Sequence, residues 1–135
     1  MRHRRAGRRL SRTTSHRQSM ERNFICSVIK NERVVTTLPK AKAMRRNLEK
    51  MITMGKKKDL VRFRRAVSFL RDKEAARKLF DVLGPRYANR PGGYSRIIRL
   101  SERRLGDGTE RAILELVDND VLERQLAAAD VEDAE

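Results

Sequence analysis

Residues 32–37 read Glu-Arg-Val-Val-Thr-Thr, a short β-branched run between two longer stretches of helical character. Valine and threonine favour extended backbone because their branched side chains fit the pleated surface of a sheet. The run therefore predicts one strand of about five residues. A lone strand leaves backbone N–H and C=O groups unpaired, so another part of the chain must supply its partner.

The partner is predicted in the last third of the chain, where two further β-rich runs occur. Residues 94–100 alternate Tyr, Arg, Ile and Leu against Ser, Ile and Arg, which is the period of a strand. Asp107-Gly108 is a turn signal, and residues 112–117 form the second run. Joined by a loop of roughly ten residues, these runs should form a hairpin that pairs with the lone strand. We expect a small three-stranded mixed sheet.

Apolar residues at spacings of three and four predict four helices around these strands. Gly55 is the expected C-cap of the second helix, and Gly84-Pro85 the expected end of the fourth. Together the patterns predict an α+β fold, with the helices in one layer packed on the sheet. The expected helices cover residues 13–31, 37–55, 59–70 and 72–83.

The charge of the chain is strongly positive and unevenly spread. Its 33 Lys and Arg residues outnumber 18 Asp and Glu residues, which gives a net charge of +15. The first 20 residues contain seven arginines and no acid, whereas residues 118–135 contain seven acids and one arginine. We therefore expect a basic arm (1–14), a globular α+β domain (15–117) and an acidic tail (118–135) that is mobile or forms a short helix. Such a basic excess points to a polyanion, most commonly nucleic acid.

The basic arm cannot fold by itself, because Leu10 is its only sizeable apolar residue after Met1. An Arg-rich segment can thread between nucleic-acid strands, where each guanidinium pairs with phosphate oxygens. A secretory signal is excluded, since the segment has no apolar region. A mitochondrial transit peptide is an alternative, but no helix drawn through residues 2–12 has an apolar face.

The sequence offers no catalytic or metal-binding constellation. His16 adjoins Ser15, but neighbouring residues on a helix do not face each other. Cys26 is the single cysteine, which excludes an internal disulfide and a Cys-based zinc site, and we expect it in the core. The apolar runs are far too short to span a membrane. We expect no enzyme activity, no cofactor, no metal, no membrane association and no small-molecule substrate.

The bases are spread over an arm, several helices, a loop and a strand. DNA readers typically place one recognition helix in the major groove, so this spread favours a folded RNA contacted on many sides. Tyr87 and Tyr94 allow two interpretations: stacking on bases, or packing of the hairpin on the fourth helix. A nucleoid-type or regulatory DNA-binding protein is the alternative function, and no feature favours an enzyme acting on RNA. The candidate RNA-binding residues are Arg2, His3, Arg4, Arg5, Arg8, Arg9, Arg12, His16, Arg17, Lys40, Lys42, Arg45, Arg86, Tyr87, Arg90, Gly92, Gly93, Tyr94 and Arg96.

A string of short motifs runs through the chain in unbroken order. At this spacing the motifs resemble those of the bacterial large-subunit ribosomal protein L-seventeen family, over residues 1 to about 117. Asn31 stands where the family commonly has His, and the loop at 105–110 differs. The motifs are Met1-Arg2-His3-Arg4, Gly7-Arg8, His16-Arg17, Arg22-Asn23, residues 32–37, Lys40-Ala41-Lys42, Arg71-Asp72-Lys73, Pro85-Arg86-Tyr87, Gly92-Gly93-Tyr94 and Arg96-Ile97.

The resemblance implies a structural component of the large ribosomal subunit that binds rRNA near the exit-tunnel side, beside neighbouring large-subunit proteins. It implies one copy per ribosome, no homo-oligomer, and a cytoplasmic, ribosome-bound location. It also implies that the arm is an RNA-binding segment and not a cleaved leader. Nothing carries over to the acidic tail, which either contacts a basic neighbouring protein or keeps the free protein from binding RNA indiscriminately.

Overall fold

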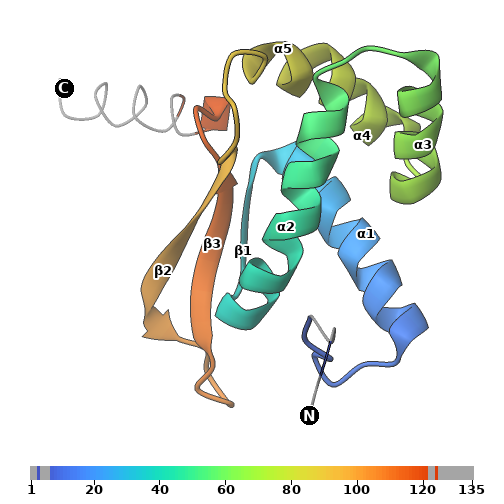
Figure 1. Cartoon of the computed structure of the whole chain (residues 1–135). Coiled ribbons are helices and arrows are strands. Elements are labelled where there is room, and N and C mark those ends of the chain that lie inside the picture. Colours follow the sequence, from blue (N-terminus) through green and yellow to red (C-terminus); the bar gives the residue numbers. More distant parts are fainter. Residues whose placement is uncertain (1–2, 4–6, 122–123, 125–135) are drawn as a thin grey trace, which may run out of the picture.

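The structure is a computed structural model that describes residue 3, residues 7–121 and residue 124 (Figure 1). The predictions for Arg2, Arg4, Arg5 and most of the acidic tail lie outside the described residues. The elements are α1 (Thr14–Asn31), β1 (Arg33–Thr37), α2 (Leu38–Gly55), α3 (Leu60–Leu70), α4 (Lys73–Lys78), the π-helical turn η1 (Leu79–Leu83), α5 (Gly84–Arg86), β2 (Ser95–Arg103) and β3 (Glu110–Leu116).

The three strands form one sheet in the order β1-β3-β2, and the helices lie on one side of it (Figure 1). This confirms the α+β class and the helical layer. Both strand pairs are antiparallel, so the expectation of a mixed sheet is wrong. The hairpin places its second strand, β3, beside β1. The strands β1 and β2 therefore run in the same direction on opposite edges, without pairing with each other.

The hairpin is longer than the sequence pattern indicates. The predicted strand ends at Leu100, but β2 continues to Arg103, with a register shift between Arg99 and Arg103. Beyond it, Arg104 N–H donates to Thr109 O at 3.0 Å and closes a loop shorter than the ten residues expected. Residues 101–103 are Ser, Glu and Arg, so the apolar alternation stops before the backbone pairing does.

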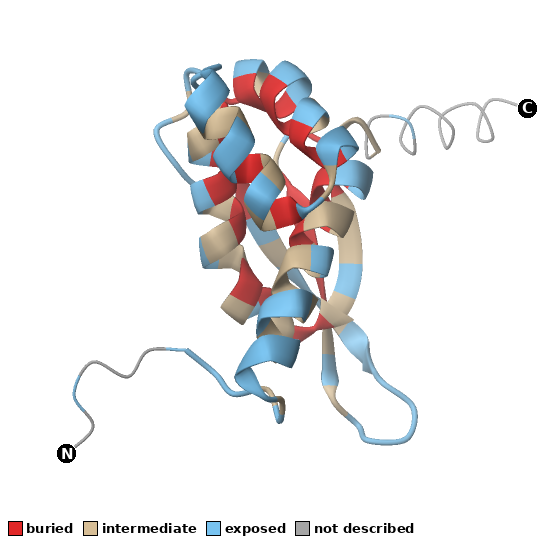
Figure 2. Ribbon diagram, turned by 90° about the vertical axis from the view of Figure 1, so that its right-hand side faces the viewer, coloured by how far each residue is buried: buried red, intermediate tan, exposed pale blue. Residues whose placement is uncertain are grey.

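A mostly aliphatic core fills the space between the helices and the inner face of the sheet (Figure 2). Burying one such side chain contributes roughly 1.5–3 kcal/mol relative to leaving it exposed. Cys26 is half-buried and packs against this core, as expected, and its Sγ donates to Leu70 O at 3.3 Å. The fully buried members include Ile25, Val28, Ile29, Leu48, Ile52, Leu79, Leu83, Leu114 and Leu116.

Gly84-Pro85 does not end the fourth helix, contrary to the prediction. The helix passes from α4 through η1 into α5 and ends at Arg86. In the π turn the Gly84 N–H donates to Leu79 O, five residues back. A Cβ on Gly84 would clash with the Gly55 carbonyl of α2, and one on Gly55 would lie 2.9 Å from Leu79 Cγ. Close helix packing therefore explains both glycines, and α2 also ends at Gly55, as predicted.

Candidate nucleic-acid-binding surface

The segment before α1 is bent so that its bases gather at the helix N-terminus. Leu10 and Ser11 both have left-handed backbone, with φ of 53° and 52°. Arg12 Nη1 donates to Leu10 O at 2.8 Å and stabilises the bend. The helix is then capped by Thr13, whose Oγ1 accepts from the His16 N–H at 3.4 Å.

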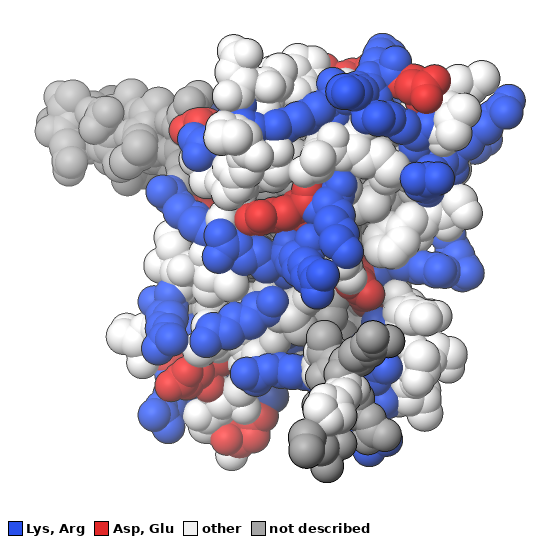
Figure 3. All heavy atoms as spheres, viewed as in Figure 1, with Lys and Arg blue, Asp and Glu red and all other residues white. Residues whose placement is uncertain are grey.

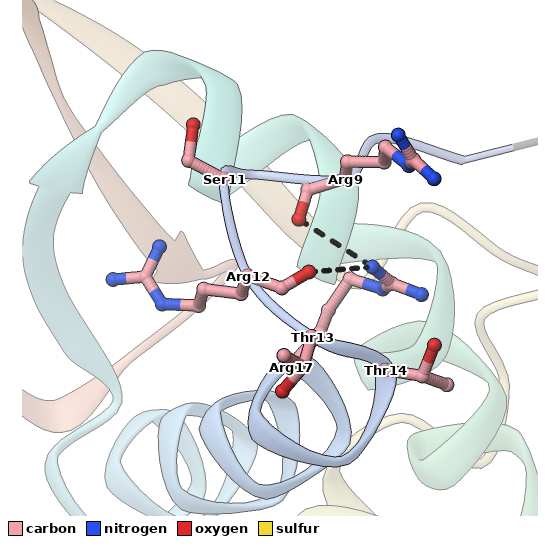
Figure 4. Close-up of a pocket in the computed structure, with 6 residues that line it drawn as sticks. All are labelled: Arg9, Ser11, Arg12, Thr13, Thr14 and Arg17. Carbon is pink, nitrogen blue, oxygen red and sulfur yellow. Dashed lines mark hydrogen bonds between the residues drawn. The ribbon is translucent and has the colours of Figure 1, made fainter.

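A hollow of about 430 Å³ lies at this bend (Figure 4). The Arg17 side chain extends across this hollow, and its Nη1 donates to Arg9 O at 3.4 Å and to Arg12 O at 3.5 Å. Figure 4 shows the guanidinium groups of Arg9 and Arg12 pointing to opposite sides. The Arg12 Nε is buried and has no hydrogen-bond partner within the described residues. The Arg17 guanidinium, the neighbouring hydroxyls and the helix N-terminus together suit a phosphate group. The lining residues are Arg9, Ser11, Arg12, Thr13, Thr14 and Arg17.

A second basic feature joins the arm to α2. Arg8 and Lys42 line one hollow of about 400 Å³, so the fold brings together two bases that are far apart in sequence. Lys42, Arg46 and Lys50 are all exposed and follow one another at four-residue spacing, about 6 Å apart along the helix. None of these four bases forms an ion pair within the part of the chain that the structure describes. We call Arg8, Lys42, Arg46 and Lys50 the basic strip.

The face that α2 presents carries many Lys and Arg side chains and few acids (Figure 3). Arg46 and Lys50 were missing from the sequence-derived candidates, although their spacing on the predicted helix could have identified them. On α3, Arg64 and Arg65 are also exposed. The helix α3 contains no acid, which is a compositional signal of the same kind.

Several predicted RNA-binding residues are engaged within the fold. Arg86 is only 15 % exposed and contacts Glu32 at 2.6 Å and Asp120 at 3.0 Å. Burial alone would lower the pKa of Arg86, but its hydrogen bonds to Glu32 and Tyr87 and the nearby carboxylates raise it above the usual value. Burial would likewise raise the pKa of Glu32, but Arg86 and Lys78 lower it below the usual value. Arg86 is thus the partner of one buried carboxylate, Glu32, and of the half-exposed Asp120.

Tyr87 and Tyr94 are 1 % and 2 % exposed, and their ring centroids lie 5.4 Å apart. The Tyr87 hydroxyl donates to Val117 O, and the Lys56 ammonium lies 4.7 Å from the Tyr94 ring centroid. In this structure the rings are inaccessible to a base. This burial favours the packing interpretation, because the rings of Tyr87 and Tyr94 contact each other from either side of the loop at this corner of the core.

The other candidates are divided between free and engaged positions. Arg45 donates to Glu49 Oε1 at 3.2 Å and to Ser95 O at 3.0 Å, which ties α2 to β2. Arg90 lies 3.4 Å from Asp118, and Arg96 pairs with Glu115. Lys40 is half-buried at the start of α2. The exposed candidates without such a carboxylate in the described part are His3, Arg8, Arg9, His16, Lys42, Gly92 and Gly93.

The described residues hold no group of three or more His, Cys, Asp or Glu side chains that could bind a metal ion. None of the helices in the described ranges has the length and apolar character needed to cross a bilayer. The site is thus a basic surface made of guanidinium, ammonium and hydroxyl groups. Its chemistry is that of binding anionic groups.

Comparison with known families identifies the chain. The sequence profile described as Ribosomal protein L17 matches residues 20–117. The chain belongs to this family. The resemblance carried by the motifs is therefore confirmed, and because L17 proteins are structural ribosome components, so is the expectation that the chain is not an enzyme.

Curated relatives are similar to this chain over most or all of its length. It is 46% identical to large ribosomal subunit protein bL17 of Allorhizobium ampelinum, over 100% of this chain and 99% of that protein. It is 51% identical to bL17 of Trichlorobacter lovleyi, over 87% of this chain and 94% of the relative. With bL17 of Geotalea daltonii the identity is 52%, over 90% of this chain and 66% of the relative.

Proposed function

We propose that this chain is a structural constituent of the large ribosomal subunit that binds and stabilises folded rRNA, in one copy, near the exit-tunnel side. The relatives bear the name of that subunit's protein bL17. The observation that carries the RNA-binding part is the basic strip, whose bases face solvent without a carboxylate partner in the described chain. Such bases release counterions when they meet phosphates, and this release drives binding.

The arm and the strip have complementary roles in this proposal. Arg8 joins the strip from the arm, and the hollow at Arg9, Arg12 and Arg17 provides a second phosphate site at the start of α1. Phosphate contacts of this kind position a protein without reading sequence, which suits a component that recognises the shape of folded RNA. In this proposal the chain lies between closely packed phosphate backbones and neutralises part of their negative charge.

The test is co-sedimentation with large subunits at low salt, followed by occupancy measurements. The triple variant Lys42→Gln, Arg46→Gln, Lys50→Gln should show clearly reduced occupancy. The matched control is Lys73→Gln, Arg77→Gln, Arg103→Gln, which removes the same charge from exposed bases on α4 and β2. Equal occupancy of the two triple variants would show that the basic strip makes no special contribution to subunit binding. Sedimentation of the protein free of ribosomes would refute the proposal as a whole.

A regulatory or nucleoid-type DNA-binding role is the alternative function. It predicts tighter binding to duplex DNA than to folded rRNA at one fixed salt concentration. The bases of the strip, the hollow and α3 lie on several elements, and no single exposed helix carries them alone. That distribution supports RNA over DNA, as the sequence did.

The first residues of the acidic tail pack on the folded domain. Asp118 pairs with Arg90, Asp120 with Arg86, and Asn119 is buried with its amide donating to Leu116 O at 2.7 Å. Of the two arginines, Arg86 is also held by Glu32, so Arg90 is the RNA-binding candidate that a tail carboxylate occupies. This supports the second hypothesis for the tail, that it limits indiscriminate RNA binding by the free protein.

A further inference from the structure

The sheet has a second face, opposite the helices, whose middle row is apolar. Pairing places Val35, Ile113 and Ile98 side by side across the three strands. These residues lie outside the core cluster. Of their neighbours along the strands, Leu114 belongs to that cluster and Ile97 packs against it. Val35 is 50% and Ile98 39% exposed, whereas Ile113 between them is only 6% exposed. An antiparallel sheet with one solvated face normally carries polar residues there, so this row needs a different explanation.

A charged row borders the apolar row at one end. Arg33, Glu115 and Arg96 lie in register, and the Glu115 carboxylate, fully buried, contacts both arginines. One acid between two guanidiniums leaves this row net positive. Arg111, two residues before Ile113 on β3, adds a further base on the same face. We call Arg33, Val35, Arg96, Ile98, Arg111, Ile113 and Glu115 the outer face.

We propose that the outer face binds a neighbouring protein that presents an aliphatic patch with a carboxylate-bearing rim. An apolar centre with a polar rim is the arrangement found in protein–protein interfaces. The positive rim requires acidic groups on the partner, and the aliphatic centre requires an apolar surface to cover it. The inference rests on the proposed function, since that function places other proteins beside this one.

Two other occupants fit the outer face less well. RNA phosphates could meet the arginines of the rim, but the aliphatic row at the centre offers neither a cation nor a ring, because none of the seven residues is aromatic. A second copy of the chain would bring two arginine-bearing rows together, while Glu115 already contacts the arginines of its own chain. Charge complementarity therefore selects a different, acid-rimmed protein.

The direct test is photo-crosslinking inside assembled large subunits. The variant Ile98→benzoylphenylalanine should form an adduct with another ribosomal protein, at a segment containing Asp or Glu. The control Arg46→benzoylphenylalanine, in the basic strip, should form its adduct with rRNA. At position 98, an rRNA adduct, an adduct with a second copy, or no adduct would overturn this inference. If the chain is absent from the subunits altogether, the proposed function and this inference both fall.

A pair of charge variants tests the complementarity separately. Ile98→Glu and Ile98→Lys remove the same aliphatic contact and differ only in the sign of the added charge. If the partner's rim is acidic, the added carboxylate of Ile98→Glu is repelled by it. This variant should therefore lower subunit occupancy at least fivefold, and considerably more than Ile98→Lys. Both purified variants should bind isolated rRNA within twofold of the unmodified chain. Equal occupancy of the two variants, or a larger loss for Ile98→Lys, would refute the acidic partner.

Discussion

Arg46 on α2 faces solvent with no ion pair in the described chain, whereas Arg86 at the end of α5 touches Glu32 and Asp120 and is 15 % exposed. Both residues are arginines in basic stretches, and both regions add to the same net charge. The difference is that one region keeps its positive charge for an external anion, and the other uses it to hold elements of the fold together. Positive charge alone therefore does not identify the binding surface.

The largest effect should come from removing the buried acid of the paired region. Glu32→Gln leaves Arg86 and Lys78 without their shared carboxylate, which they contact at 2.6 and 2.9 Å. Breaking a buried pair from one side typically costs about 3–5 kcal/mol. We expect a loss of roughly 3 kcal/mol in the free energy of unfolding by urea, since both bases are partly exposed.

The control for this variant is Arg46→Ala in the basic strip, which should stay within about 0.5 kcal/mol of the unmodified chain. A loss below about 1 kcal/mol for Glu32→Gln would mean that the buried network does not stabilise the fold. The contrast between the two regions would then disappear.

A smaller effect is expected from the glycine that positions the helix carrying Arg86. Gly84→Ala places a methyl group against the Gly55 carbonyl, so α5 must shift. Overpacking of this kind costs about 1–3 kcal/mol. Gly92→Ala is the matched control, because nothing lies within 4 Å of its Cβ position. Equal thermal unfolding midpoints for the two variants would show that the helices do not need this close approach.

The pH dependence of stability should separate the regions further. The pKa of Glu32 is lowered in the folded state, so its contribution is fully present above the ordinary Glu value. It is lost as the pH falls through the lowered folded value. Urea unfolding between about pH 6 and pH 2 should therefore show a smaller acid-induced loss for Glu32→Gln than for the unmodified chain. Arg46→Ala should keep the full loss, and identical slopes for all three would count against this ion pair.

The sequence predicted the elements that local pattern determines, and missed those that depend on distant partners. Helical spacing located α1, α2 and α3, and β-branched runs located β1 and β3. The strand order could not be predicted from the sequence, because tertiary packing decides which strand of the hairpin pairs with β1. The π turn was missed because its close contact between Gly84 and Gly55 joins two helices.

The same limit applies to the candidate site. Tyr87 and Tyr94 fit either stacking or packing until the fold shows them buried together. Arg86 could not be told from Arg46, since its partner Glu32 lies 54 residues away in the chain. Conversely, helical spacing alone places Arg46 and Lys50 on the exposed face of α2, so these two residues could be predicted from the sequence.

We expect the basic strip to contact phosphates and Arg86 to stabilise the fold. The salt dependence of binding to a large-subunit rRNA fragment tests this difference most directly. The triple variant Lys42→Gln, Arg46→Gln, Lys50→Gln should reduce the slope of log affinity against log salt by about 2 to 3, since each lost phosphate contact removes about 0.7–0.9. Arg86→Gln, measured where it is folded, should leave the slope unchanged. A slope lowered by Arg86→Gln and not by the triple variant would show that Arg86, and not the basic strip, contacts the phosphates.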